Sequence, residues 1–132
     1  MLAARLLQVH NYLMDKPLFV VDVDLTIYDC FSKPPQLING SRLLLQTLST
    51  IGEVHLWSAG GESHARNIAQ EFELTDTITD YHNKPAYPPT EKEAIRILGR
   101  VATLQIDDDP TERIADWPFV EATAMRELYG LY

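Results

Sequence analysis

Two aspartates, Asp22 and Asp24, stand one residue apart at the end of an apolar, β-branched run, FVVDVDL. Burying an ionised carboxylate without a partner is costly, so an apolar segment that ends in two acids needs a compensating charge. A second acidic group, Asp107, Asp108 and Asp109, ends another apolar run, VATLQIDDD. Carboxylates that converge repel one another, and a hard cation such as Mg²⁺ with oxygen ligands relieves that repulsion. The two acidic segments therefore predict a metal site.

Polar residues also occur after another apolar segment and in a loop. Ser58 comes directly after EVHLW and precedes Ala59 and two glycines, and Lys84 lies in the loop sequence NKP. A hydroxyl and turn amides near a helix N-terminus favour an anion, and an ammonium group adds a point charge. If these groups lie close to the aspartates, a hydroxyl and a positive charge stand beside the predicted metal site.

The elements that must position these residues alternate between strand-like and helix-like segments. Strands are predicted at 17–24, 53–57, 75–80 and 101–109 and, more weakly, at 117–122; helices at 41–50, 62–72 and 90–98; short helical turns at 110–116 and 124–130. Thr90 and Glu93 have capping-box spacing, and Gly99 follows the end of that helix. The alternation with short connections predicts an α/β fold, a parallel sheet covered on both faces in a three-layer α/β/α sandwich. Ligands of such sheets bind beyond the carboxyl ends of the strands, where these polar residues fall.

Length and composition predict one domain over residues 1–132, since 132 residues with 45% hydrophobic content can bury a core. Apolar residues recur at helical spacing near the start of the sequence, at Leu2, Leu6, Val9 and Leu13. This pattern predicts an additional N-terminal helix over residues 1–16, packed on the sheet or on a partner such as a second copy in a homodimer. No segment is apolar enough for a membrane helix or signal peptide, and the single cysteine, Cys30, fits a reducing compartment, so a cytoplasmic protein without a membrane partner is expected. The formal charge of −8 makes a nucleic-acid partner unlikely.

The ordered set of polar residues resembles the four motifs of the haloacid dehalogenase superfamily. DVDLT (22–26) looks like motif I, DxDx[TV]; LWSAG, with Ser58, resembles motif II; Lys84 of NKP resembles the motif III lysine; and IDDD (106–109) resembles motif IV. Each short pattern recurs by chance, but the four together follow the family's order, each at or just after a predicted strand. The resemblance implies the family's Rossmann-like core, with the motif I strand central and the motif IV strand beside it.

The same resemblance implies a Mg²⁺-dependent phosphatase that acts on a phosphorylated substrate. Asp22 would be the nucleophile that forms an aspartyl-phosphate, and Asp24 would act as general acid and then as general base. Mg²⁺ would be held by the Asp22 carboxylate, the Asp24 backbone carbonyl and Asp107 or Asp108, while Asp109 could instead cap the turn at Pro110. Members that remove halide from carbon generally lack the second aspartate, so Asp24 favours a phosphate ester.

The resemblance gives the remaining positions supporting roles. Ser58 and the N–H groups of the turn from Ala59 onward, together with Lys84, would bind the phosphoryl group, and Thr26 would support the site. Lys84, followed by proline, matches motif III better than Lys92, which lies in the capped helix. Position 25 is leucine where many members have glycine, a change that the superfamily tolerates.

Two other functions stay open. A phospho-acceptor domain resembling response-regulator receivers also uses an aspartate, acidic ligands, a hydroxyl and a lysine on a parallel sheet, although receivers place the acidic pair first and the acceptor later. A catalytically inactive binding module is the other. The histidines at positions 10, 55, 64 and 82 show no metal-ligand spacing, and none of them is expected to be catalytic.

The connections between the motifs predict a site without a cap domain. Only residues 25–57 separate Asp24 from Ser58, and only residues 59–83 separate Ser58 from Lys84. In the family an open site accompanies large substrates such as proteins or polynucleotide ends, or a cap lent by another subunit. The segment YDCFSKPPQLING (28–40) is long enough to form a flap that selects substrates.

Overall fold

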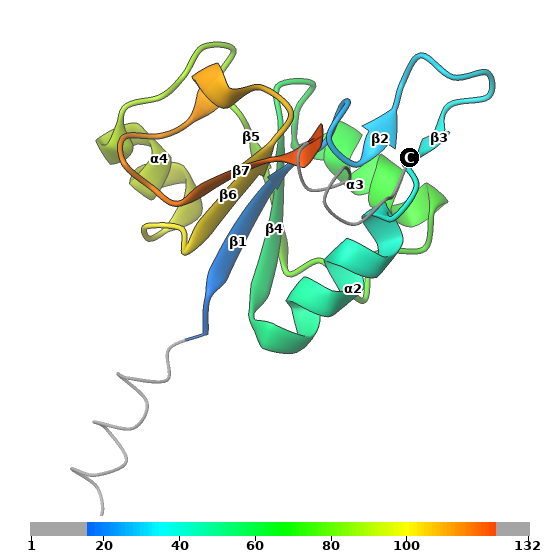
Figure 1. The fold of residues 1–132 in the computed structure, drawn as a ribbon, viewed down its shortest axis with the longest axis horizontal. Helices are drawn as coiled ribbons and strands as arrows, with labels where there is room; N and C mark the ends of the chain where they lie inside the picture. Colours follow the sequence, from blue (N-terminus) through cyan, green and yellow to red (C-terminus); the bar gives the residue numbers. More distant parts are fainter. Residues whose placement is uncertain (1–15, 124–132) are drawn as a thin grey trace, which may run out of the picture.

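The structure, a computed structural model, describes residues 16–123, and its centre is strand β1 (Leu18–Asp22). This strand is the middle one of a five-stranded parallel sheet with the order β5-β4-β1-β6-β7 (Figure 1). Its neighbours are β4 (Glu53–Ser58) and β6 (Leu104–Asp107), and the edges are β5 (Asp80–Asn83) and β7 (Phe119–Glu121). All five residues of β1 are buried, which explains why this segment is an uninterrupted apolar run rather than an alternating one. The expected positions of the first and fourth predicted strands, central and adjacent, are confirmed.

Helices cover both faces of the sheet, which confirms the three-layer sandwich. Helices α2 (Ser41–Ile51) and α3 (Glu62–Glu71) lie on one face, and α4 (Glu91–Leu98) lies on the other (Figure 1). Alternate residues of β1 serve the two cores: Phe19 and Val21 face the first layer, and Leu18 and Val20 face the second. The sheet is thus held from both sides, and its carboxyl edge is the rim on which the polar residues lie.

The caps of α4 follow the sequence prediction. The Thr90 hydroxyl accepts a hydrogen bond from Glu93 N at 3.2 Å, and the Thr90 hydroxyl donates to the Glu93 carboxylate at 3.1 Å. Gly99 ends the helix with φ 91°, in the left-handed region that glycine adopts without strain. Ala94 and Leu98, four residues apart, form its buried face.

The strand predicted at 75–80 is wrong in position. Residues 75–77 form a turn, with Thr77 N donating to Leu74 O at 2.9 Å, and β5 starts only at Asp80. The β-branched residues of this segment suggested a strand, but pairing with β4 determines where the strand begins. Thr79 N donates to Val54 O at 2.8 Å, and the parallel register then continues to Asn83.

The segment after β1 holds a short hairpin of β2 (Tyr28–Asp29) and β3 (Gln36–Leu37), where the sequence predicted a flap. The two connections between the motifs contain this hairpin, α2, α3 and single strands, so within residues 16–123 no cap domain is inserted. The short helical turn predicted after Asp109 is a 3₁₀ turn (Pro110–Glu112). The predicted N-terminal helix and the predicted turn at 124–130 lie outside the described residues. No helix of the described part is long and apolar enough to cross a membrane.

Candidate active site

Lys84 joins carboxylates from different parts of the chain at the carboxyl edge of the sheet. Its Nζ atom lies 2.7 Å from Asp107 Oδ2, 3.3 Å from Asp22 Oδ1 and 3.8 Å from Glu112 Oε2. Only 7% of the Lys84 side chain and 1% of the Asp107 side chain are exposed. Because β1 and β6 are paired neighbours, their last residues, Asp22 and Asp107, meet at the same rim. Lys84 comes directly after β5, and its backbone N–H donates to Ser58 O at 2.9 Å, which fixes the loop that delivers the ammonium group.

The cluster is buried and holds more carboxylates than ammonium groups, and the pKa values of its aspartates are raised. Burial, followed by the neighbouring charge of Asp107, raises the pKa of Asp22 to about 7, although Lys84 and a hydrogen bond from Thr26 act in the opposite direction. Burial also raises the pKa of Asp107 to about 6, against the lowering effect of Lys84. For Lys84, burial favours the neutral form, but the carboxylates of Asp22 and Asp107 outweigh burial and raise its pKa. The single ammonium group therefore does not keep Asp22 fully ionised at neutral pH.

The donor atoms of the cluster fit an additional hard cation. Carboxylate oxygens of Asp22, Asp107 and Asp108 lie within 4.8 Å of one another. All three ligands are oxygens, which suits Mg²⁺, and a bound cation would lower the pKa values that burial raises. The side chain of Asp24 is not in this group, so a role for Asp24 in metal binding would rest on its backbone carbonyl, as the sequence resemblance implies.

Thr26 lies inside the acidic cluster. Its hydroxyl is 2.9 Å from Asp22 Oδ2 and 3.3 Å from Asp108 Oδ1. The chain returns to this position through a tight turn in which Leu25 adopts φ 63°, the left-handed conformation that favours glycine. Asp109 does not enter the cluster with its side chain: Asp109 Oδ1 accepts from Thr111 N at 2.9 Å and so caps the 3₁₀ turn.

Asp24 lies at the rim of the site, with a different environment from Asp22. Its carboxylate accepts a hydrogen bond from His64 Nε2, with N···O distances of 3.0 and 3.2 Å to the two oxygens, and 37% of its side chain is exposed. The His64 ring, from the first turns of α3, also makes an edge contact with Tyr28 in the hairpin, with ring centroids 6.2 Å apart. The two aspartates of the DxD pattern are thus separated into a buried group beside Lys84 and a solvent-accessible group held by His64.

The turn after β4 presents Ser58 and Ala59 next to α3. The Ser58 hydroxyl is buried and accepts a hydrogen bond from Gly60 N at 3.0 Å, so part of its role is to shape the glycine turn. Since the hydroxyl only accepts in this contact, its hydrogen can be donated to another acceptor. Ala59 is exposed, and one N–H at the start of α3, that of Glu62, already donates to Asn83 Oδ1.

Sequence analysis missed the contacts of four residues, His64, Glu112, His55 and His82. His64 meets Asp24 only because α3 folds back over the carboxyl end of β1, 40 residues along the chain. Glu112, on the 3₁₀ turn, points a buried oxygen toward Lys84. His55 and His82 lie in hydrogen-bond contact across β4 and β5. The alternation of residues in these two strands would predict the last pair, but only once the register of the strands is known.

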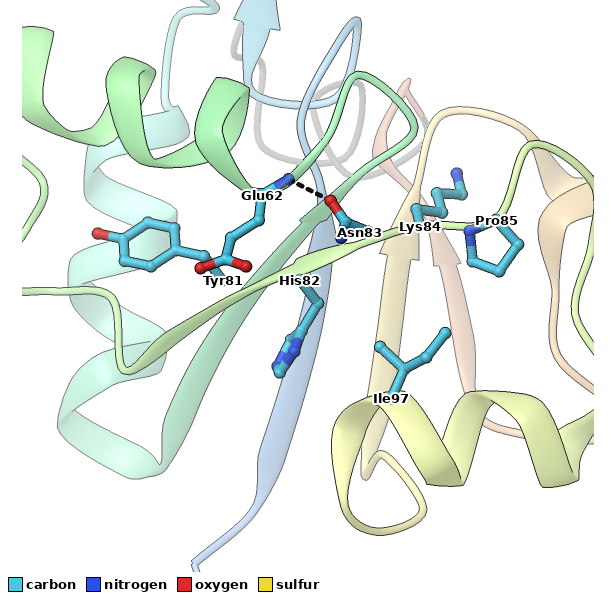
Figure 2. Close-up of a pocket in the computed structure, with 7 residues that line it drawn as sticks. All are labelled: Glu62, Tyr81, His82, Asn83, Lys84, Pro85 and Ile97. Atoms are coloured by element: carbon cyan, nitrogen blue, oxygen red, sulfur yellow. Dashed lines mark hydrogen bonds between the residues drawn. The ribbon is translucent and has the colours of Figure 1, made fainter.

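A hollow of about 420 Å³ lies beside the end of β5 and the start of the loop that follows it (Figure 2). It is lined by Glu62, Tyr81, His82, Asn83, Lys84, Pro85 and Ile97. Figure 2 shows Lys84 and His82 leaving the end of β5 in different directions, with Ile97 of α4 on the His82 side. Lys84 is therefore shared by the hollow and the acidic cluster, whereas Asp22 and Asp107 do not line the hollow.

Comparison with known proteins establishes the fold and not a family. No family model and no curated protein matches the chain. Among solved structures, the crystal structure of a hydrolase from Streptococcus pneumoniae TIGR4 is similar, with a TM-score of 0.61 and 14% sequence identity; the match covers 88% of this chain and 99% of that chain. The shared architecture is therefore one that a hydrolase uses, and the chemistry has to be argued from the residues at the rim of the sheet.

Proposed function

We propose that this protein is a Mg²⁺-dependent phosphatase of the haloacid dehalogenase type, which hydrolyses a phosphomonoester through an aspartyl-phosphate on Asp22. The observation that carries the proposal is the convergence of Asp22, Asp107 and Lys84 around one ammonium group, with N···O distances of 3.3 and 2.7 Å. The ordered DxD, serine, lysine and acidic motifs, together with a fold shared with a hydrolase, support the same reading.

In the first half-reaction, an Asp22 carboxylate oxygen attacks phosphorus in line with the ester bond. The new Asp22 O–P bond forms as the bond between phosphorus and the ester oxygen breaks, and the ester oxygen takes a proton from Asp24 as it leaves. The accessible position of Asp24, with 37% of its side chain exposed, suits a proton donor to a departing alcohol. His64, within 3.0 Å, would hold that carboxyl group toward the substrate.

In the second half-reaction, a water molecule attacks the phosphorus of the aspartyl-phosphate. Asp24, now ionised, accepts a proton from this water, and the P–O bond to Asp22 breaks. Inorganic phosphate leaves, and both aspartates return to their starting protonation states. One acid thus serves both steps, because the proton that Asp24 gives to the leaving alcohol is replaced by one that it takes from the attacking water.

The other residues of the rim would bind the transferring phosphoryl group. Lys84 places a positive charge next to Asp22, and Ser58 with the turn amides lies near the N-terminus of α3, where an anion is favoured. When bound, Mg²⁺ supplies charge neutralisation between the nucleophile and the phosphate oxygens. Asp22, Asp107 and Asp108 would hold it, and Thr26 would orient two of these carboxylates through its hydroxyl.

The substrate class follows from what lies above the site. Within residues 16–123 the segment between β1 and α2 holds only a short hairpin and no inserted domain, and Phe31 in the hairpin loop is 76% exposed. An uncapped site of this kind suits a phosphate on a large molecule that itself excludes water, and the charge of −8 disfavours polynucleotides. A phosphorylated protein or peptide is therefore the class that we propose to test first.

The test is phosphate release from a panel of phosphomonoesters, measured with Mg²⁺ and with a chelator. The panel should include an aryl phosphate, phosphopeptides and phosphorylated oligonucleotide ends. We expect Mg²⁺-dependent turnover that is abolished by Asp22→Asn. No release from any member, combined with stable labelling of the chain by a small phospho-donor, would contradict a phosphatase and favour a phospho-acceptor domain.

A further inference from the structure

A second group of ionisable side chains lies within β4 and β5, away from the acidic cluster. His55 Nδ1 and His82 Nε2 are 2.9 Å apart, and His82 Nε2 is 3.8 Å from Asp80 Oδ2. One ligand atom from each of the three residues lies within 4.8 Å of the other two. The imidazole rings are stacked obliquely, with centroids 5.0 Å apart. Two imidazoles and one carboxylate with converging atoms are a donor set that a metal ion can use.

The register of the two strands brings these residues together. His55 pairs with Asp80, and Trp57 pairs with His82, in a parallel arrangement. Residues two apart in a strand share a face, so His55, Asp80 and His82 all lie on the face that α4 covers. Their exposure is graded: His55 is buried, His82 is half-buried and Asp80 is exposed. A cation could therefore enter from the open edge of β5, next to the hollow that His82 lines (Figure 2).

We propose that His55, Asp80 and His82 form a binding site for a late first-row divalent cation, with Zn²⁺ as the preferred ion. In a tetrahedral zinc site the metal–ligand bonds of about 2.0–2.1 Å place neighbouring ligand atoms roughly 3.3 Å apart. Two of the three separations, 2.9 and 3.8 Å, lie within about half an ångström of that value, and the third, between His55 and Asp80, is within 4.8 Å. A water molecule would complete four-coordination at the solvent-facing side.

The local electrostatics support this donor set. Burial lowers the pKa of His55, and the neighbouring His82 and Arg100 act in the same direction. The carboxylates of Asp80 and Glu53 act in the opposite direction. Burial also lowers the pKa of His82, against Asp80 and Glu62, which raise it. Both rings are therefore neutral at neutral pH, the form in which imidazole binds a metal. Asp80 supplies the negative charge that a divalent cation requires.

The location gives the site a structural role. A cation there would join edge strand β5 to β4 through side chains, in addition to their backbone pairing. Lys84 follows β5 directly, so the metal would also hold the strand from which Lys84 reaches Asp22. The inference does not depend on the proposed phosphatase activity, because no step of that reaction uses these histidines.

The experiment is a titration of the metal-free protein with Co²⁺, followed by its visible absorption, with Zn²⁺ added afterwards as competitor. Co²⁺ replaces Zn²⁺ in tetrahedral sites and then absorbs strongly, whereas six-coordinate Co²⁺ in an oxygen site absorbs weakly. We expect an intense band that Zn²⁺ removes and that an excess of Mg²⁺ leaves unchanged. Loss of a ligand should cost at least about tenfold in affinity, since loss of an outer-shell partner alone costs that much.

Matched variants decide where the cation binds. Asp80→Asn and His82→Gln should lower the Co²⁺ affinity at least about tenfold. Two controls should leave the band intact: Asp76→Asn, which makes the same change at an exposed position, and Asp22→Asn. Asp80 is exposed, so its variant reports even if His82→Gln fails to fold, which circular dichroism would show. A weak band only, a band that survives in Asp80→Asn, or a band lost in Asp22→Asn would each overturn the proposal.

Discussion

The acidic cluster at the carboxyl ends of β1 and β6 and the histidine cluster within β4 and β5 are both partly buried groups of ionisable side chains, but burial acts on them in opposite directions. It raises the pKa of Asp22 to about 7 and lowers the pKa of both histidines. In each case burial favours the neutral form, which for an acid is the protonated one and for a histidine the deprotonated one. The histidines are therefore ready to bind a cation at neutral pH, whereas Asp22 and Asp107 still compete with protons for one.

The difference also lies in the ligand atoms. The acidic cluster offers only oxygens, which suit a hard cation such as Mg²⁺, and the histidine cluster offers two nitrogens and an oxygen, which suit Zn²⁺. The first cluster lies at the rim, where a substrate can reach it, while the second lies along the strands. We therefore propose a catalytic role for the first cluster and a structural role for the second.

Replacing the nucleophile should have the largest effect. Asp22→Asn keeps the shape of the side chain but removes the charge that attacks phosphorus, so phosphate release should fall by about 10⁴-fold or more. Steady-state phosphate release with Mg²⁺ measures this loss. Asp76→Asn, an exposed change of the same kind, should retain wild-type activity; an equal loss in both variants would remove the distinction between the acidic cluster and ordinary surface acids.

Replacing Asp24 should separate the two half-reactions. Asp24→Asn should lower turnover by about 10²–10⁴-fold, the usual contribution of a general acid and base. The first step should suffer less with an aryl phosphate, whose leaving group needs little protonation, so the phosphorylated form should accumulate with that substrate. Rapid-quench measurements of the first and later turnovers would show a burst. An equal loss in both steps with every substrate would contradict the assigned role.

Replacing Lys84 should affect both activity and the electrostatics of the rim. Lys84→Met keeps the buried stem and removes the charge, so phosphate release should fall by about 10²-fold. The loss should come with a higher Mg²⁺ requirement or lower stability at alkaline pH, because two carboxylates lose their ammonium partner. Lys92→Met on the exposed side of α4 is the control and should be silent.

A smaller effect is expected on stability. The acidic cluster and the histidine cluster should change Tm differently with pH, and the difference should be about 5 °C. The folded-state pKa of Asp22 lies above its ordinary value of 3.8, so its stabilising contribution is present at low pH and is lost as pH rises through about 7. The histidines have lowered pKa values, so their contribution is present above the ordinary histidine pKa of 6.5 and is lost as pH falls below it.

Metal-free thermal unfolding from pH 5 to pH 8 isolates the two contributions. Asp22→Asn should gain stability relative to wild type at pH 8 and lose that advantage at pH 5. His82→Gln should show its relative gain at pH 5 instead, since it removes a group that is costly to protonate in the folded state. Parallel shifts of the two variants across this range would mean that the clusters do not respond oppositely to burial.

The sequence predicted the sheet and its central strand because local signals were strong there. The all-apolar run of β1 and the capped helix α4 need little tertiary information. The start of β5 was misplaced because its residues, DYHN, are polar and follow a more strand-like segment. Only pairing with β4 places Tyr81 in the core, and pairing across 25 residues or more is not a local property.

The candidate site shows the same difference between what local sequence predicts and what depends on tertiary packing. Asp22, Lys84 and Asp107 could be brought together in advance, because the carboxyl ends of parallel strands meet at one rim. His64 could not, since its contact with Asp24 depends on how α3 is oriented over the sheet. The histidine pair required the register of β4 with β5, which a one-residue error would reverse, turning one side chain to the opposite face.

The most direct test of the central claim is mass analysis of peptides from Asp24→Asn quenched during reaction with an aryl phosphate and Mg²⁺. The account predicts a phosphoryl group on the peptide that contains Asp22, labile to base, and absent when Asp22 is also replaced by asparagine. Phosphate release without any such adduct, or an adduct on another residue, would contradict Asp22 as the nucleophile.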